Sequence, residues 1–134
     1  ARAEHIAQVI NPALQKGHWV LCDRFVDATF AYQGGGRGEQ QQRIQLLADW
    51  TLKGLMPDLT LLFDLPVELG LKRIIQRQEA IDRFEQEKVD FFEKIRKSYL
   101  NSAVNEPERV KIVDASLSIN AIQQQLTQLL TPLI

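Results

Sequence analysis

The sequence of 134 residues lacks a second cysteine, a long apolar run and an excess of either charge. The single cysteine, Cys22, excludes an intrachain disulfide and fits a reducing compartment, so we expect the cytoplasm. We also expect Cys22 to be a small hydrophobic residue buried in a strand. No apolar run approaches the roughly 20 residues that cross a bilayer, which argues against a membrane partner. A net charge of −1 gives no electrostatic reason to expect nucleic acid either.

The chain also lacks an initiating Met and a strand before its first helix. Residues 1–14 already show helical spacing, with Ile6, Val9 and Ile10 on one face. No N-cap residue precedes them. We therefore expect this sequence to be the carboxyl-terminal portion of a longer domain.

Strand and helix patterns alternate along the rest of the sequence. Short apolar runs predict strands at residues 19–22, 59–65 and 109–113. Helical spacing predicts helices between and after them, at 27–32, about 44–55, 66–75, about 91–99 and 119–129. This alternation predicts one α/β domain over residues 1–134, with a parallel sheet and helices on both faces.

Asp23 and Arg24 follow the first predicted strand directly. The carboxyl ends of parallel strands open on the ligand crevice, and the planar guanidinium of Arg suits a phosphate. Asp23 could hold a Mg²⁺-bound water or orient the arginine. A surface ion pair at a strand end is the alternative, and these two residues alone leave both interpretations open.

Gly34, Gly35, Gly36 and Gly38 surround Arg37 in a glycine-rich stretch. This stretch is no Walker A motif, because no Lys-Ser/Thr pair follows and no strand immediately precedes it. We predict that the glycines end the helix at 27–32 and form a hinge.

Three arginines and an aromatic residue are weaker signals. Arg73 and Arg77 share one helix face, and Arg83 follows in a mostly polar stretch at 76–88 that predicts an exposed crossing. Such arginines could close over a nucleotide, but charged helix faces are usually just solvated. Tyr32 and Gln33 could stack on a base and bind its edge, or could simply end a helix.

Several of these segments together resemble bacterial thymidylate kinases. The resemblance covers essentially the whole chain and rests on ARAEH, the DRF motif at 23–25, AYQGGGRG, PDLTLLFDLP, DRFEQE and the closing strand with Asp114-Ala115. It implies a three-layer α/β/α P-loop nucleoside-monophosphate-kinase fold, with a lid at about 73–88. It also implies an enzyme that transfers the γ-phosphoryl group of ATP to dTMP with Mg²⁺, and a homodimer.

The resemblance also assigns residues to roles. It implies that Arg2, Arg24, Thr29, Tyr32 and Gln33 bind dTMP. Asp114, Ala115 and Ser116 would lie against the adenine of ATP. The catalytic group would be Asp23, Arg24, Arg73, Arg77 and Arg83, with no direct protein ligand to the metal and Asp23 near it through water.

The strand–GxxxxGK[ST]–helix unit of this fold does not occur in the sequence. We therefore expect the 134 residues alone to be inactive, and the full-length enzyme to carry the ATP-binding loop elsewhere. Two alternatives stay open: a monophosphate kinase for another base, and a non-catalytic binding or interaction module.

Overall fold

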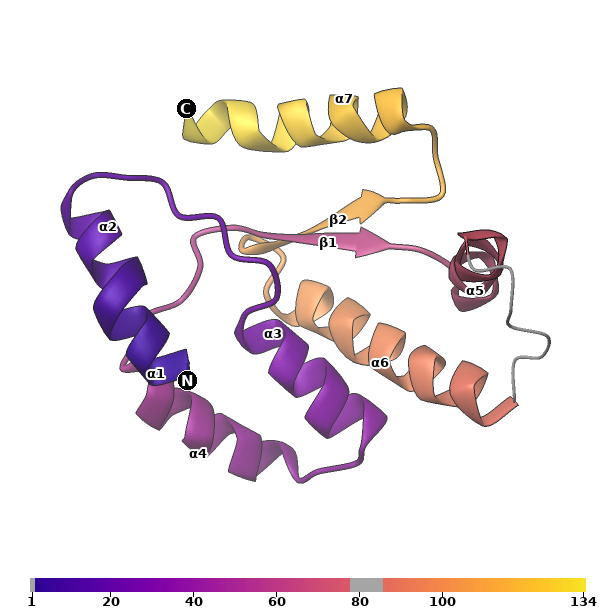
Figure 1. Cartoon of the computed structure of the whole chain (residues 1–134), viewed down its shortest axis with the longest axis horizontal. Coiled ribbons are helices and arrows are strands. Elements are labelled where there is room, and N and C mark those ends of the chain that lie inside the picture. Colours follow the sequence, from indigo (N-terminus) through magenta and orange to yellow (C-terminus); the bar gives the residue numbers. More distant parts are fainter. Residues whose placement is uncertain (1, 78–85) are drawn as a thin grey trace.

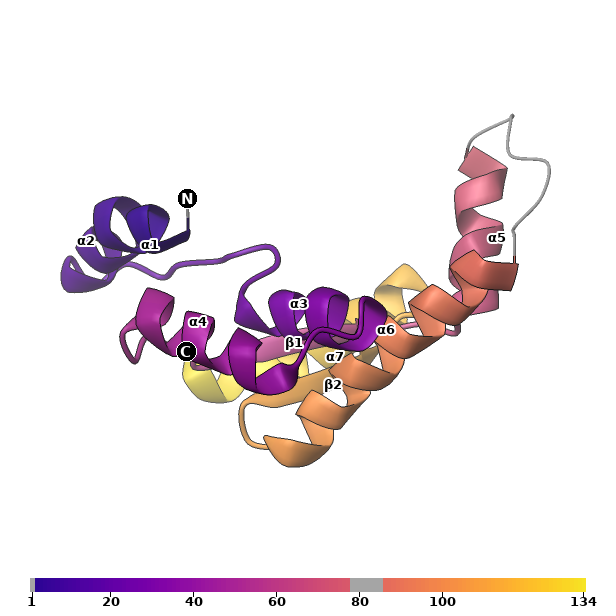
Figure 2. The ribbon, with the colours of Figure 1, turned by 90° about the horizontal axis from the view of Figure 1, so that it is seen from below.

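Two parallel strands lie at the centre of the computed structural model, which describes residues 2–77 and 86–134. Strand β1 (Thr60–Asp64) pairs with β2 (Val110–Asp114) along its whole length. Helix α7 (Ile119–Leu130) lies on one side of the strands and α6 (Gln86–Asn105) on the other, as both views show (Figures 1 and 2). The predicted parallel sheet between two helical layers is therefore confirmed.

The strands expected at 59–65 and 109–113 are confirmed with slightly shifted ends. β1 leads into α5 (Val67–Arg77), and the side chains of Val67 and Leu71 on this helix are buried. The predicted lid at about 73–88 thus begins as the last turns of α5 and ends in the first turn of α6. Residues 78–85 lie outside the described part of the chain.

The strand expected at residues 19–22 is not present. The segment is irregular, its Leu21 is 98% exposed, and Cys22 is exposed rather than buried. No backbone hydrogen bond joins it to β1 or β2 within the described ranges. A strand requires a neighbour that pairs with its backbone groups, so apolar composition alone was not sufficient for the prediction.

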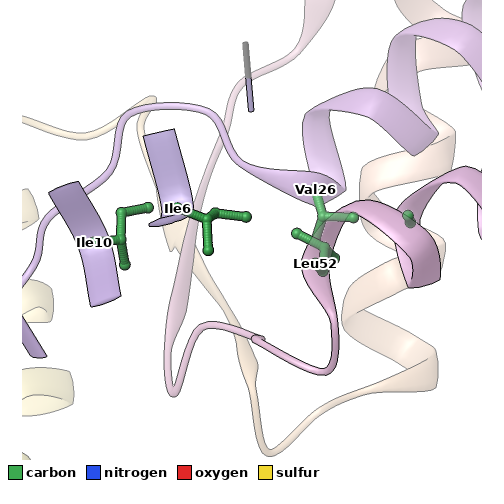
Figure 3. Close-up of a cluster of buried hydrophobic side chains, with 5 residues drawn as sticks. Ile6, Ile10, Val26 and Leu52 are labelled. Atoms are coloured by element: carbon green, nitrogen blue, oxygen red, sulfur yellow. The ribbon is translucent and has the colours of Figure 1, made fainter. Parts of the chain in front are cut away.

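The first helical segment forms part of the hydrophobic core. It comprises α1 (Arg2–His5), η1 (Ile6–Ile10) and α2 (Asn11–Gln15). Ile6 and Ile10 are buried with Val26, Ala48 and Leu52 (Figure 3). The predicted apolar face is confirmed at these two isoleucines, whereas Val9 is half exposed.

The glycine-rich stretch is helical, which corrects the predicted hinge. Helix α3 (Val26–Thr29) continues into the π-helical segment η2 (Phe30–Gly36), and the helical run ends in a turn at Arg37 and Gly38, where Gly38 has φ of 70°. A Cβ on Gly35 would lie 2.7 Å from the Ser98 Cβ, and one on Gly36 would lie 2.7 Å from the Phe91 ring. These glycines allow η2 to approach α6 closely, and this packing offsets their low helix propensity.

Helix α4 (Gln41–Leu52) packs through one face and exposes another. Ile44, Ala48 and Leu52 are buried, as the sequence pattern predicts, but Leu47 is exposed. A short 3₁₀ turn, η3 (Thr131–Leu133), follows α7. Among the described helices, none is both long and apolar enough to cross a bilayer.

Candidate functional site

Arg2 and Thr29 lie together although 27 positions separate them. The Arg2 guanidinium donates a hydrogen bond of 2.7 Å to Thr29 Oγ1 and a longer one of 3.4 Å to the Phe25 carbonyl oxygen. Its central carbon also lies 5.7 Å from the centre of the Phe25 ring, within cation–π range. The first helix thus brings a cation to the end of α3, where the family resemblance implies that dTMP binds.

Arg24 lies over Tyr32. Its guanidinium carbon is 5.2 Å from the ring centroid, and Nη2 donates a 3.4 Å hydrogen bond to the Tyr32 hydroxyl. Arg24 has φ of 60°, a left-handed conformation that costs a non-glycine residue roughly 1–2 kcal/mol. Backbone strain of this kind is concentrated at functional sites. The side chains of Asp23 and Arg24 are both exposed, so an incoming anion can reach them.

Tyr99 on α6 belongs to the same region and was not predicted as a site residue. The rings of Tyr32 and Phe91 meet edge to face at 6.4 Å, which places α6 against this part of η2. Burial raises the pKa of the half-buried Tyr99, and the neighbouring Tyr32 raises it further, while Arg24 opposes the rise. Tyr99 occupies an apolar position in the spacing of α6, so the sequence pattern gave no reason to separate it from core residues.

Gln33 has a different neighbour from the rest of the predicted dTMP-binding group. Its Oε1 accepts a 3.3 Å hydrogen bond from Arg37, and this contact is exposed. Both residues lie one helical turn apart near the end of η2. The π-helical geometry of this segment is common at functional sites.

A second cluster forms where β2 ends. Arg73 donates to the carbonyl oxygens of Ala115 (2.9 Å) and Ser116 (3.5 Å). Ser116 in turn donates from its backbone N–H (2.9 Å) and hydroxyl (2.5 Å) to Asp114 Oδ1, and these bonds lower the pKa of Asp114. Gln125 of α7 bonds both backbone groups of Asp114. The predicted adenine loop is thus an ordered turn held by Arg73.

The remaining predicted residues are placed only in part. Arg77 is the last residue of α5, but its side chain lies outside the described part of the structure, as does Arg83. In both views α5 lies away from α1 and α3, so the two clusters are separate (Figures 1 and 2). Within the described ranges, no three His, Cys, Asp or Glu side chains lie close enough to hold a metal ion.

Comparison with known proteins gives consistent matches over the whole chain. It is 53% identical over 134 residues to a thymidylate kinase of Pseudomonas putida strain GB-1, and 54% identical over 134 residues to one of Pseudomonas syringae pv. tomato. It is 51% identical over 133 residues to a thymidylate kinase of Cupriavidus pinatubonensis. All or nearly all of this chain is covered, but it spans 63%, 63% and 65% of the lengths of these relatives.

A parallel sheet between helical layers, with arginine side chains at the surrounding loops and helices, defines an α/β protein. A sequence model of the thymidylate kinase family matches residues 1–126, and the chain belongs to that family. The family has the P-loop nucleoside-monophosphate-kinase fold, which confirms the predicted fold class.

Proposed function

We propose that the natural protein containing this chain transfers the γ-phosphoryl group of ATP to dTMP, giving dTDP. The proposal rests on membership of the thymidylate kinase family and on the names of the curated relatives. In this proposal, the described residues contribute the dTMP-binding part of the site and a turn that lies against the adenine of ATP.

One observation carries the dTMP assignment: two arginines from separate segments meet two residues of a single helical run. Arg2 donates a hydrogen bond to Thr29, and Arg24 lies over the ring of Tyr32. Thr29 is the last residue of α3, and Tyr32 follows three positions later in η2, so both contacts lie within one turn of the helical run. The nucleotide would then lie along Thr29 and Tyr32, with the Arg2 guanidinium near its base and the Arg24 guanidinium near its phosphate.

The chemistry of each side chain suggests which part of dTMP it would contact. Arg2 and Thr29 would bind the polar edge of thymine, with Gln33 beside the base. Tyr32 would pack against the deoxyribose, and Arg24 would hold the phosphate through two parallel hydrogen bonds. The acceptor oxygen of dTMP is already ionised at neutral pH, so the residues need only position it in line and offset its charge.

The resemblance also implies Mg²⁺, and the described carboxylates do not form a site for it. Mg²⁺ is commonly bound through substrate phosphates and one or two carboxylates, with the rest of its shell water. In the proposal it would therefore enter with ATP and supply charge neutralisation, with Asp23 close enough to contact a metal-bound water. No step is assigned to a protein-bound metal.

The donor side of the proposal involves the second cluster. Asp114, Ala115 and Ser116 would lie against the adenine of ATP, and Arg73 supports this by fixing two carbonyl oxygens of the turn. Arg73, Arg77 and Arg83 are proposed to neutralise the transferring phosphoryl group. Changing each to Ala should lower kcat far more than dTMP affinity, and an unchanged kcat in all three variants would contradict this role.

The activity is tested by expressing the natural protein from its complete gene and measuring ADP formation with dTMP, dCMP, dGMP or UMP. We expect turnover to be fastest with dTMP. An Arg24→Gln variant should raise the dTMP KM by about a hundredfold, since it removes the cation that orients the phosphate. Arg43→Gln, at an exposed position on α4, is the control for loss of one positive charge. Absence of dTMP-dependent ADP formation, or a preference for another base, would refute the proposal.

Two further properties belong to the same proposal. A homodimer would use the exposed apolar side of α4, where Trp50 is 77% exposed and Leu46 and Leu47 are also exposed. Sedimentation of the natural protein, with Trp50→Glu for comparison, would test it. A cytoplasmic location is supported by the lone, exposed Cys22.

A further inference from the structure

Asp27 is a buried carboxylate on the helix that carries the proposed dTMP-binding residues. It lies in α3, two positions before Thr29 and five before Tyr32, and is 7% exposed. At about 100° per residue of an α-helix, Thr29 lies about 200° around α3 from Asp27. The Asp27 side chain therefore lies away from Thr29, and both of its carboxylate oxygens already accept hydrogen bonds from Arg109 or Thr60.

Asp27 is held by a network from two other parts of the chain. Arg109, next to β2, donates to both carboxylate oxygens, at 2.7 Å to Oδ1 and 2.9 Å to Oδ2. Thr60, the first residue of β1, donates to Oδ2 at 3.3 Å and accepts from Arg109 at 2.8 Å. Glu106 accepts two bonds from the other side of the same guanidinium, at 2.8 and 3.0 Å.

This network fixes more than one degree of freedom of α3. A bidentate pair sets both the distance and the rotation of the carboxylate relative to the guanidinium plane. Thr60 then ties both partners to the first residue of β1. Because a buried ion pair often stabilises a fold no better than apolar side chains of similar size, its specific contribution here is geometric.

We propose that Asp27 is a positioning residue for the acceptor nucleotide: with Arg109 and Thr60 it sets the rotation of α3 on the sheet. That rotation places Thr29 beside Arg2 and Tyr32 beside Arg24. The inference rests on the proposed function for its kinetic consequence, but its structural consequence holds without any nucleotide. Loss of the network should loosen α3 and η2 and weaken dTMP binding, while ATP binding at the separate turn after β2 changes little.

The test uses Asp27→Asn in the full natural protein, because Asn keeps the shape but turns an NH₂ group toward the Arg109 donors. Thr60→Val is the milder second variant, since it leaves the Asp27–Arg109 pair intact. Asp64→Asn is the matched control: it weakens a bidentate pair with Arg96 of 2.8 and 3.0 Å that does not involve α3. Each variant is assayed for dTMP KM, ATP KM and kcat, and for amide hydrogen exchange without nucleotide.

We expect Asp27→Asn to raise the dTMP KM about tenfold and Thr60→Val about threefold, with the ATP KM within about twofold. Exchange should quicken at residues 26–36 and stay unchanged in α7. Asp64→Asn should show neither effect. Equal rises in both KM values, or unchanged exchange at 26–36 in a folded variant, would overturn the inference.

If Asp27→Asn does not fold, Thr60→Val decides by the same criteria. A wild-type protein that ignores dTMP would refute the proposed function instead, and the exchange experiment would still decide whether Asp27 positions α3.

Discussion

The two ends of strand β1 each carry a bidentate arginine–carboxylate contact, in very different surroundings. At its start, Thr60 joins the Asp27–Arg109 pair, whose side chains are 9% and 12% exposed. At its end, Asp64 pairs with Arg96 of α6, and these side chains are 21% and 30% exposed. The closest distances, 2.7 and 2.8 Å, are almost the same.

The two pairs differ in whether water can solvate the charge that remains when one partner is removed. When one partner of an exposed pair is removed, water solvates the other, so little free energy is lost. When one partner of a buried pair is removed, an uncompensated charge remains in a medium of low polarity. Equal geometry therefore predicts unequal consequences, and Glu106 on the outer side of Arg109, with its side chain 49% exposed, extends the comparison to a more exposed carboxylate. All variants below are made in the full natural protein.

The largest effect is expected for Arg109→Met, which leaves the Asp27 carboxylate buried without its cation. We expect the free energy of unfolding to fall by about 3–5 kcal/mol. Urea denaturation followed by circular dichroism measures this. The double variant Asp27→Leu/Arg109→Met serves as a control, since it removes both charges and should recover most of the loss. A loss below about 1 kcal/mol in the single variant would show that water reaches Asp27.

A smaller effect is expected for Arg96→Met at the other end of β1. The pair is partly exposed, so we expect a loss of about 1–2 kcal/mol. A double-mutant cycle with Asp64→Asn isolates the coupling between the two side chains. Raising the salt concentration should reduce that coupling, because exposed charges are screened. A loss as large as that of Arg109→Met would remove the distinction between the two ends of the strand.

Much of the fold could be predicted because its signals are local. The apolar runs at 59–65 and 109–113 and the helical spacing at 119–129 each match an element within a residue or two at most positions. The errors at 19–22 and at the glycines have one cause. Whether a backbone segment becomes strand or helix there depends on a partner far away in sequence: a strand that does not pair with 19–22, and α6, which packs closely against Gly35 and Gly36.

The candidate site was harder to predict from the sequence, because its contacts also join residues far apart in the chain. The family resemblance selects Arg2, Thr29, Arg24 and Tyr32, and the structure brings them together in pairs. The resemblance gave no signal for Tyr99, whose position near Tyr32 and Arg24 follows from the packing of α6. Asp27 and Arg109 are 82 positions apart, and neither lies in a pattern that would have connected them.

Glu106 offers a pH-dependent measure of a pair whose carboxylate is more exposed than those at either end of β1. Hydrogen bonds from Arg109 lower the pKa of Glu106 from its ordinary 4.5, against the effect of burial. The unfolded chain therefore binds a proton at higher pH than the folded one, so this stabilisation is present above pH 4.5 and is lost as the pH falls through the lower folded value. Because the side chain is 49% exposed, we expect it to contribute about 0.5 kcal/mol.

The corresponding experiment compares Tm between pH 7 and pH 3 for wild type and Glu106→Gln. The difference between the two proteins should be largest at pH 7 and should decrease as the pH falls below 4.5. Glu108→Gln controls for the change in net charge, since its side chain is 99% exposed. A difference that grows toward acid pH would contradict the assigned sign.

The smallest effect is expected for the Lys111–Glu108 pair, which sets the lower end of the scale. It shares the three-residue spacing of Glu106 and Arg109, but its closest distance is 3.8 Å, and Glu108 is fully in solvent. Lys111→Met should change the free energy of unfolding by less than about 0.5 kcal/mol at pH 7. The same urea titration measures it beside Arg109→Met. If both variants lost the same stability, spacing along the chain rather than burial would determine the strength of these pairs, and the contrast between the two ends of β1 would lose its physical basis.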